Sequence, residues 1–599
     1  MSAPKYREFK FGVTQGTVTN GEDGVQYLRS VPLAPYAERM TDRFIQHARA
    51  NPDKIFMAQR VKNADGTKGD WRHLHWGDAL AGARRIAAGL IQRGLSADRP
   101  VAILSENDLE HAQIILGCLY AGVPYCSVSQ AYSTVSQDYE KLRHVLKTIT
   151  PGLIFAADKA RYGKAITTTA VECCGEGVEI IYTDDGYAEL LATPAADAVD
   201  AAQQATNGDT IVKFLFTSGS TKLPKSVINT QRMWCANQEQ MRTSMPALKE
   251  GWHVMVDWLP WNHTFSGNHN FGLIMYNGGT IYIDEGKPVP ALIGETFRNL
   301  REISPTIYLN VPTGFEQIAN AMKTDDLLRK TLLKDVQMFF YAGAALAQPI
   351  WDSLFESQER EIGERIVMTT GLGMTESSPF GLFVTSKDVK AGYLGLPTAG
   401  LTLKLVPVSG KVEVRYKGDN ITPGYWRNPE ATAESFDEEG YFCTGDAVKW
   451  IDESDINQGL KFDGRIAEDF KLATGTFVSV GPMRAKIIAA GAPYVQDAVI
   501  TGLNMKEVGA MVIPTTTARA LEKAMLHAHL QSMMNELAKT ATGSASKVAR
   551  MIVLDELPSI DKGEITDKGS INQRAVLTHR AALVDALHAD TAAGVIKPT

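Results

Sequence analysis

The chain of 599 residues is too long for one hydrophobic core and predicts at least two domains. Its hydrophobic fraction (44%) and charged fraction (22%) are ordinary for a globular protein, and the formal net charge of −7 argues against a nucleic-acid-binding protein. Residues 1–30 lack the apolar core of a signal peptide, and the longest apolar stretch (114–128) is too short to span a bilayer. The six cysteines show neither a C-x-x-C pair nor a zinc spacing, which fits a reducing compartment. We therefore expect a cytoplasmic protein with no membrane or nucleic-acid partner.

Helical and strand patterns alternate through the first three quarters of the chain. The patterns predict helices over residues 76–95, 109–121 and 142–149, and strands over residues 100–104, 153–156, 211–216 and 366–368. This alternation favours parallel sheets with helices on both faces. Ligands of such folds bind beyond the carboxyl ends of the strands, so the loops after Phe216 and Met368 are candidate binding sites.

After residue 400 the pattern changes to short strands, which predict a small β subdomain. These strands cover residues 402–406, 412–416, 441–442 and 448–451. A new unit follows, with predicted helices over 483–490 and 518–538 and predicted strands over 495–501, 508–514 and 552–554. We place the boundary at about residues 462–465, which gives an N-terminal domain of residues 1–464 and a C-terminal domain of residues 465–599.

The segment Phe214-Leu-Phe-Thr-Ser-Gly-Ser-Thr-Lys-Leu-Pro-Lys225 is the most informative stretch of the chain. An apolar strand ends in a loop that contains Gly219 and Lys225 and four hydroxyl groups, those of Thr217, Ser218, Ser220 and Thr221. Hydroxyl and amide donors together with a mobile cation can surround a polyphosphate. The spacing is not that of a Walker A loop. Taken alone, a Ser/Thr-rich surface turn is an equally good interpretation.

Four further segments follow in the chain: Thr370-Gly-Leu-Gly-Met-Thr-Glu376, Thr444-Gly-Asp446, Asp463-Gly-Arg465 and Gly563-Glu-Ile-Thr-Asp-Lys568. With the loop above, and in this order, they resemble the core motifs of the adenylate-forming superfamily, which includes acyl- and aryl-CoA synthetases. The resemblance extends from about residue 35 to about residue 580. It implies an α/β fold, in which a large N-terminal lobe of parallel-rich sheets flanked by helices and a small β subdomain precede a small mobile α+β C-terminal domain.

The resemblance also implies two half-reactions. A carboxylate attacks the α-phosphate of ATP to give an acyl-adenylate and pyrophosphate, and a thiol, in most members coenzyme A, then displaces AMP. Thr375 would contact the α-phosphate, Asp446 would accept hydrogen bonds from both ribose hydroxyls, and Glu376 would bind Mg²⁺. The implied ATP- and AMP-binding residues are Thr217, Ser218, Gly219, Ser220, Thr221, Lys225, Gly343, Ala344, Ala345, Gly371, Leu372, Gly373, Met374, Thr375, Asp446 and Arg465.

The C-terminal domain would supply the catalytic lysine. The resemblance assigns this role to Lys568, with Lys562 as the alternative, and makes Thr217 and His263 its catalytic partners in the N-terminal domain. After adenylation the C-terminal domain would rotate about residues 465–468, so that Lys471 and Gly475 bind coenzyme A. Ala467 stands where the superfamily often has Asp or Lys as the pivot, so the hinge residue stays open.

The segment Leu259-Pro-Trp-Asn-His263-Thr-Phe265 resembles the one that flanks the acyl site. Phe265 is equally well interpreted as a core residue. The implied acyl-binding residues are His263, Phe265, Ala342, Gly343 and Gly371. The motifs look most like those of bacterial feruloyl-CoA synthetases, which implies ferulate, p-coumarate or caffeate as substrate. The alternatives are a fatty-acid or other aryl-acid CoA ligase and an adenylation enzyme that loads a carrier protein; we expect a monomer or homodimer.

Overall fold

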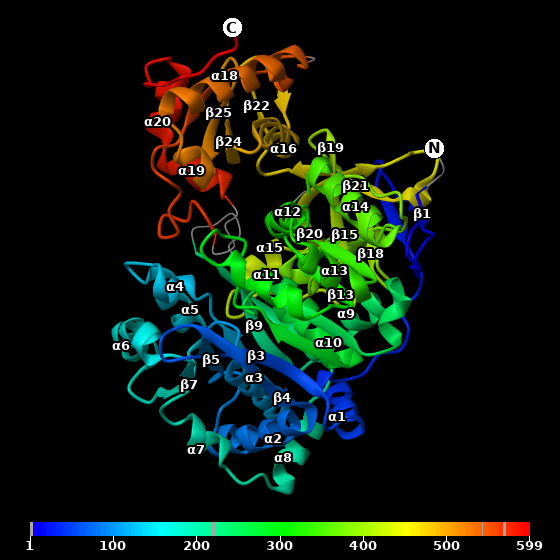
Figure 1. Cartoon of the computed structure of the whole chain (residues 1–599), viewed down its shortest axis with the longest axis vertical. Coiled ribbons are helices and arrows are strands. Elements are labelled where there is room, and N and C mark those ends of the chain that lie inside the picture. Colours follow the sequence, from blue (N-terminus) through cyan, green and yellow to red (C-terminus); the bar gives the residue numbers. More distant parts are fainter. Residues whose placement is uncertain (1–3, 218–222, 345, 542, 567–570) are drawn as a thin grey trace.

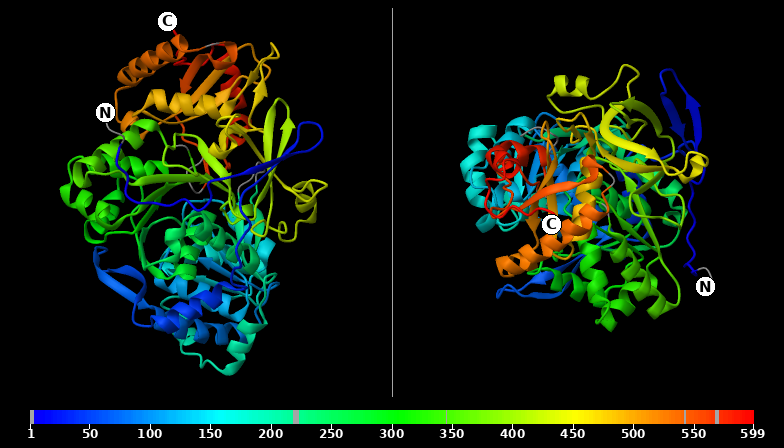
Figure 2. Two further views of the ribbon diagram at one scale, coloured as in Figure 1. Left: turned by 90° about the vertical axis from the view of Figure 1, so that its right-hand side faces the viewer. Right: turned by 90° about the horizontal axis from the view of Figure 1, so that it is seen from above.

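The computed structural model describes residues 4–217, 223–344, 346–541, 543–566 and 571–599. Within these residues, a large N-terminal lobe contains three β-sheets with helices packed around them, and a smaller C-terminal domain lies above it (Figure 1). The side view in Figure 2 shows the same division, with the orange and red end of the chain on top of the lobe. The predicted α/β class, with a large lobe and a small C-terminal domain, is confirmed.

One sheet of the lobe has six strands, which in spatial order are β10 (Lys225–Thr230), β9 (Ile211–Thr217), β6 (Tyr125–Ser127), β5 (Val101–Leu104), β7 (Leu153–Ala156) and β8 (Glu179–Tyr182). Five of them run parallel, and all four residues of β5 are buried, as expected for a sheet covered by helices. The covering helices include α2 (Trp76–Gln92), α3 (Leu109–Ala121), α5 (Glu140–Ile149) and α6 (Lys159–Cys174). Because β10 turns back antiparallel to β9, the loop between them leaves and re-enters at one end of the sheet.

A second sheet has four strands, in the order β11 (His253–Asp257), β12 (Gly279–Ile283), β3 (Ile55–Lys62) and β4 (Lys68–His75). Between β11 and β12 the chain forms a π-helical turn, η2 (Phe265–Asn270), which continues into α10 (Phe271–Asn277). Every residue of these two helices is buried, so the segment lies in the core of the lobe. π-Helical turns are rare and are frequent at functional sites.

The third sheet has eleven strands, in the order β1 (Thr17–Asn20), β2 (Gln26–Arg29), β18 (Thr402–Val408), β19 (Lys411–Lys417), β20 (Phe442–Trp450), β21 (Leu460–Arg465), β17 (Tyr393–Pro397), β16 (Leu382–Phe383), β15 (Val367–Leu372), β14 (Met338–Tyr341) and β13 (Ile307–Asn310). The expected β subdomain is its antiparallel part, hydrogen-bonded to the parallel strands β13 to β15. The two strands predicted over 441–442 and 448–451 are one strand, β20. A bulge within β20 breaks the apolar pattern without ending the strand.

The C-terminal domain contains the three-stranded sheet of β24 (Val495–Thr501), β25 (Val508–Pro514) and β26 (Val548–Val553), packed against α16 (Val480–Gly491) and α18 (Lys523–Lys539). The single helix predicted over 518–538 is wrong, because a turn at residues 520–522 separates α18 from the short α17 (Thr516–Arg519). The Thr515 side chain caps α17 by accepting a hydrogen bond from the Ala518 amide. The strand predicted from residue 552 begins at Val548, since that residue already pairs with β25.

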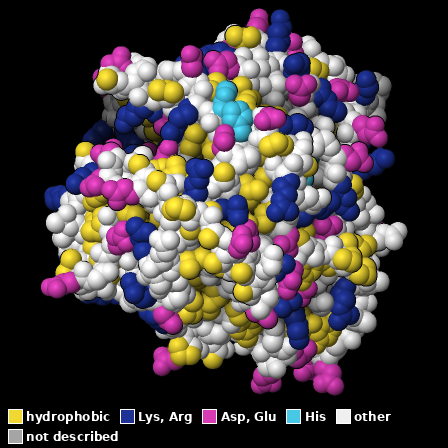
Figure 3. Space-filling model, turned by 90° about the horizontal axis from the view of Figure 1, so that it is seen from below, with side chains coloured by type: hydrophobic (Ala, Val, Ile, Leu, Met, Phe, Trp, Pro, Cys, Tyr) yellow, Lys and Arg dark blue, Asp and Glu magenta, His cyan; other side chains and the backbone are white. Residues whose placement is uncertain are grey.

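The lower face of the molecule is mixed in charge, with Lys and Arg side chains interspersed with Asp and Glu side chains (Figure 3). Among the described helices, we find none whose length and hydropathy would allow it to cross a bilayer.

Candidate active site

The two ends of the predicted phosphate-binding loop are held side by side. Thr217, the last residue of β9, pairs with Lys225, the first residue of β10. The strand below is anchored in the core, because Phe214 and Leu215 are almost fully buried. The Lys225 ammonium lies 4.8 Å from the centre of the Tyr425 ring. The loop residues Ser218, Gly219, Ser220 and Thr221 lie outside the described residues.

Tyr425 also contacts the predicted metal ligand. Its hydroxyl donates a hydrogen bond of 2.9 Å to Oε1 of Glu376, which is buried in the short helix η3 (Thr375–Ser377) beside Thr375. The Tyr425 segment is attached to β10 by a bridge to Val227. Burial and the Glu376 charge raise the pKa of Tyr425, so the hydroxyl stays a donor. One tyrosine therefore joins Glu376 to Lys225.

The chemistry of Glu376 fits a magnesium ion. Mg²⁺ prefers oxygen ligands and is commonly held by one or two carboxylates together with substrate phosphates. In the described part of the chain no three or more His, Cys, Asp or Glu side chains form a metal-binding group. Glu376, next to the predicted phosphate-binding loop, is the carboxylate that could share an ion with phosphate oxygens.

Asp446 and Arg465 face each other across β20 and β21. The two residues pair in the sheet, and Nε of Arg465 lies 3.3 Å from Oδ1 of Asp446. Burial raises the pKa of Asp446, and the Arg465 charge opposes this effect. Burial raises the pKa of Tyr416, and the Asp446 charge raises it further. The Tyr416 ring lies next to Gly381, whose amide donates a 3.2 Å hydrogen bond to the Leu372 carbonyl at the end of β15.

The turn after β14 and the end of β15 carry the residues predicted to bind adenine and the acyl group. The strands are paired at Tyr341 and Thr370, so Ala342 and Gly343 lie next to Gly371. Gly343 has a φ of +92°, a conformation that favours glycine. A Cβ at Gly371 would lie 2.1 Å from the Leu382 carbonyl, and one at Gly373 would lie 1.5 Å from the Pro379 carbonyl. Both glycines are thus required for the close approach of the 379–383 segment. Ala344 and Met374 flank this region, and Ala345 lies outside the described residues.

The π-helical turn η2 brings Phe265 into a cluster of rings. We define the aromatic cluster as Phe265, His269, Phe340, Phe380 and Phe383, whose ring centres lie 5.2–6.2 Å apart in successive pairs. Phe340 directly precedes Tyr341 and so places the cluster beside the turn at Gly343. His263 lies just before η2, and its Nδ1 accepts a hydrogen bond of 3.3 Å from the Phe265 amide.

His269 is a residue of this cluster that the sequence alone does not identify. Burial lowers its pKa to about 4, so the imidazole is neutral at neutral pH, and Nδ1 lies 3.0 Å from Oδ1 of Asn270. Its Nε2 has no hydrogen-bond partner in the described structure. The signal in the sequence is the spacing of four residues from Phe265, which places both side chains along one helical turn.

Lys213 is a second residue that the sequence alone does not identify. It interrupts the apolar run of β9, where its Nζ donates a 2.8 Å hydrogen bond to the Gly267 carbonyl of η2 and lies 3.4 Å from the Trp234 ring centre. Burial lowers the pKa of Lys213 well below its ordinary value. Lys213 therefore connects the strand of the phosphate-binding loop to the turn that carries Phe265.

Helix α5 contacts both the phosphate-binding loop and the C-terminal domain. Nζ of Lys141 donates a 2.6 Å hydrogen bond to the Ile560 carbonyl. About one turn further on, Nε2 of His144 lies 2.8 Å from the Pro224 carbonyl, at the end of the loop. The segment that carries Lys562 thus lies next to the phosphate-binding loop. Nζ of Lys562 is 3.7 Å from Glu556, and Lys568 lies outside the described residues.

The predicted coenzyme A residues lie on the hairpin of β22 (Phe470–Lys471) and β23 (Phe477–Val478). Gly475 has a φ of +81°, and the space around its Cα is open. A cavity of about 330 Å³ separates this hairpin from the β18–β19 hairpin; its lining includes Lys411, Ile466, Lys471, Phe477 and Leu503. Next to it, Lys411 forms a close, buried ion pair with Asp469. This pair joins the N-terminal lobe to the chain just after the predicted hinge at 465–468.

Comparison with known proteins gives matches over both domains. The model described as AMP-binding enzyme matches residues 44–426, and that of the AMP-binding enzyme C-terminal domain matches residues 469–592. Fatty acyl-CoA synthetase A of Dictyostelium discoideum is 24% identical over 518 residues, covering 77% of this chain and 74% of that protein. 4-Coumarate–CoA ligase 1 of Petroselinum crispum is 23% identical over 513 residues, covering 81% and 86%. Among solved structures, the anthranilate CoA ligase AuaEII in complex with anthranoyl-AMP has a TM-score of 0.72 at 18% identity and covers 92% of this chain and 99% of that one.

Proposed function

Because this chain belongs to the AMP-binding enzyme family and is an acid–thiol ligase that uses ATP and coenzyme A, we propose that it activates a hydroxycinnamic acid such as ferulate, p-coumarate or caffeate. The carboxylate of the acid attacks the α-phosphate of ATP, forming an acyl-adenylate and releasing pyrophosphate. The thiol of coenzyme A then attacks the acyl carbon, and AMP leaves as the thioester forms.

The adenylation step is supported best by the position of Tyr425 between Lys225 and Glu376. The step brings a carboxylate against a polyanion, so its barrier depends on positive charge and hydrogen-bond donors placed near the phosphates. In this proposal Lys225 and the hydroxyl of Thr217 bind the β- and γ-phosphates. Glu376 holds Mg²⁺, which when bound neutralises phosphate charge.

The remaining nucleotide contacts come from the eleven-stranded sheet. Asp446 accepts hydrogen bonds from the two ribose hydroxyls, a task that suits a carboxylate because it only accepts. Burial raises the pKa of that carboxylate, and the nearby Arg465 guanidinium opposes the rise. The adenine lies between the turn at Gly343 and the end of β15. Thr375 contacts the α-phosphate, and Lys568, with Lys562 as the alternative, bridges that phosphate and the attacking carboxylate.

The aromatic cluster supports an aromatic acid. Its rings lie next to the turn at Gly343, where the acyl group must be for its carboxylate to reach the α-phosphate. In this proposal the phenyl ring of the substrate makes offset or edge-to-face contacts with Phe265 and Phe340, whose own ring centres lie 5.7 Å apart. Nε2 of His269 offers a polar contact within this apolar region, which suits a substrate that carries a ring hydroxyl. The relative that acts on 4-coumarate is in keeping with this choice.

A panel of acids tests the proposal. Formation of AMP is measured with ATP, Mg²⁺ and coenzyme A for cinnamic, hydroxycinnamic, benzoic and fatty acids. We expect the highest kcat/KM for hydroxycinnamic acids. Turnover confined to fatty acids would favour the second candidate, a fatty-acid CoA ligase, which the similarity to fatty acyl-CoA synthetase A supports. AMP formation that needs no coenzyme A but needs a carrier protein would favour the carrier-loading alternative.

A further inference from the structure

The motif Thr444-Gly445-Asp446 occupies a bulge in β20. In the neighbouring strand β19, Glu413 pairs with Ala447 and Arg415 pairs with Cys443. The three residues of the motif therefore lie opposite a single residue of β19, Val414. Backbone amides in a bulge lose their partners in the strand ladder and need others. Oγ1 of Thr444 accepts a 3.0 Å hydrogen bond from the Asp446 amide. Oε1 of Glu413 accepts a 3.1 Å hydrogen bond from the Gly445 amide.

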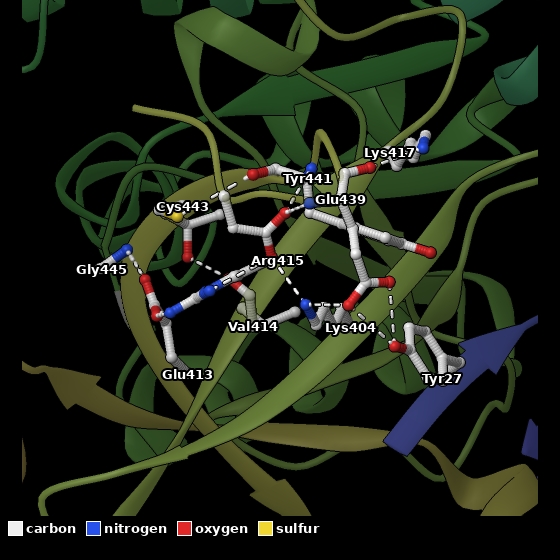
Figure 4. A network of polar contacts seen from close by, with 12 residues as sticks. Tyr27, Lys404, Glu413, Val414, Arg415, Lys417, Glu439, Tyr441, Cys443 and Gly445 are labelled. Atoms are coloured by element: carbon white, nitrogen blue, oxygen red, sulfur yellow. Dashed lines mark hydrogen bonds and ion pairs between the residues drawn. The ribbon is translucent and has the colours of Figure 1, made fainter. Parts of the chain in front are cut away.

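The Glu413 carboxylate is itself held in one orientation. Its Oε2 accepts a 2.8 Å hydrogen bond from Nε of Arg415, and Figure 4 shows Glu413 between Arg415 and Gly445. Arg415 contacts Oδ2 of Asp437 at 3.2 Å, and Lys404 contacts the same oxygen at 2.9 Å. Glu413 is 7% exposed. A network of alternating charges therefore holds in place the Glu413 oxygen that accepts the hydrogen bond from the Gly445 amide.

The backbone conformation of Gly445 affects the direction in which the side chain of the next residue, Asp446, points. Its φ of +70° is a left-handed conformation, and glycine is the residue that loses most conformational freedom when its backbone is ordered. The Gly445 carbonyl accepts a 3.0 Å hydrogen bond from the Ile466 amide in the predicted hinge segment. With the amide bound to Glu413 and the carbonyl bound to Ile466, both ends of this flexible residue are held.

We propose that Glu413 is a positioning residue for the ribose site: by binding the Gly445 amide, it directs the Asp446 carboxylate toward the two ribose hydroxyls of ATP. This inference rests on the proposed function, which assigns the ribose to Asp446. Glu413 does not touch the nucleotide. Its effect is therefore confined to the contacts that Asp446 makes.

The experiment compares the binding of ATP and of 2′,3′-dideoxy-ATP by calorimetry. The proteins are the unchanged enzyme, Glu413→Ala, Glu413→Gln and the control Tyr27→Phe, which removes a hydrogen bond to Glu439 at the far end of the same network. In Glu413→Ala we expect the Kd for ATP to rise about 10- to 100-fold, with the Kd for the dideoxy analogue unchanged. Glu413→Gln keeps a carbonyl acceptor for the Gly445 amide and retains most of the preference for ATP. Tyr27→Phe matches the unchanged enzyme.

Three results would overturn the inference. The first is equal weakening of both nucleotides in Glu413→Ala, which would mean general damage to the fold. The second is an unchanged preference for ATP in both Glu413 variants. The third is that the unchanged enzyme binds both nucleotides equally well, which would mean that Asp446 does not bind the ribose hydroxyls. A failure of the proposed function is detected by a separate measurement: the unchanged enzyme would then release no pyrophosphate in response to a carboxylic acid substrate.

Discussion

The hydroxyl of Tyr425 donates a 2.9 Å hydrogen bond to Oε1 of Glu376, while the ring of the same tyrosine lies 4.8 Å from the Lys225 ammonium. This relationship places the carboxylate of η3 and the cation at the start of β10 around one side chain. Substitutions at Glu376 and at Tyr425 therefore give a graded test of the metal role proposed for Glu376.

We predict that Glu376→Gln abolishes Mg²⁺-supported pyrophosphate release, because the amide is a poor ligand for this ion. Tyr425→Phe keeps the ligand but loses the hydrogen bond that orients it, and should raise the Mg²⁺ concentration needed for half-maximal rate by about 10- to 100-fold. The control is Tyr36→Phe, which removes a similar hydrogen bond to Asp419 outside the site. The same Mg²⁺ requirement in Tyr425→Phe and Tyr36→Phe would contradict the assignment.

The catalytic lysine is tested by separating the half-reactions. Lys568→Ala should slow adenylation by about 10²- to 10³-fold, as expected for loss of one donor that acts in the transition state. Thioester formation from pre-made acyl-adenylate should be little changed. Lys562→Ala is the matched comparison, and pyrophosphate release is the measurement for both. If Lys562→Ala loses adenylation and Lys568→Ala does not, the roles of the two lysines are exchanged.

His269 should determine the response to a ring hydroxyl. Replacing it by leucine removes Nε2 while keeping an apolar side chain of similar length. We expect kcat/KM for p-coumarate to fall by about 10-fold, the free energy of one hydrogen bond, whereas kcat/KM for cinnamate, which lacks the hydroxyl, changes little. The ratio of the two values is the measurement, and a parallel loss for both acids would disprove a specific contact.

The loop that carries Lys562 should be sensitive to acid. Glu564 is buried and accepts hydrogen bonds of 2.9 Å from both Nε and Nη2 of Arg580 and from the Ser559 amide. Burial alone would raise the pKa of Glu564, but Arg580 outweighs it and the pKa falls below its ordinary value of 4.5. The Glu564 contribution to folding is therefore complete above about pH 4.5 and is lost as the pH falls through the lower, folded-state pKa.

Hydrogen exchange of residues 556–564 measures this contribution. Glu564→Gln should lower the free energy of local opening by about 1.5–3 kcal/mol near neutral pH, as for hydrogen bonds to charged groups. The variant should also lack the decline that the unchanged protein shows in acid. A loss of the same size at every pH would show that the charge of Glu564 is not responsible.

Features that depend on a motif or on the apolar pattern of a short segment could be predicted from the sequence. The buried strand before Thr217, the Thr375-Glu376 pair after β15 and the two-domain α/β fold all follow from motifs and apolar periodicity. The break between α17 and α18 was not predicted, because the Ala-rich segment has helical propensity on both sides of a turn.

Three residues in or beside the proposed site could not be identified from the sequence because their partners are distant in the chain. Lys213 binds the Gly267 carbonyl 54 residues away, and Glu413 binds the Gly445 amide 32 residues away. His269 is distinguished by an unsatisfied nitrogen within a ring cluster that several strands build. Such roles depend on register and packing, which no local pattern specifies.

The most direct test of the account is ATP–pyrophosphate exchange measured in the absence of coenzyme A. If an acyl-adenylate forms on the enzyme, labelled pyrophosphate enters ATP only when a hydroxycinnamic acid and Mg²⁺ are both present, and Asp446→Ala or Glu376→Gln abolishes the exchange. Exchange that is independent of the acid, or its absence under conditions in which the enzyme makes the CoA thioester, would contradict activation through an adenylate at this site.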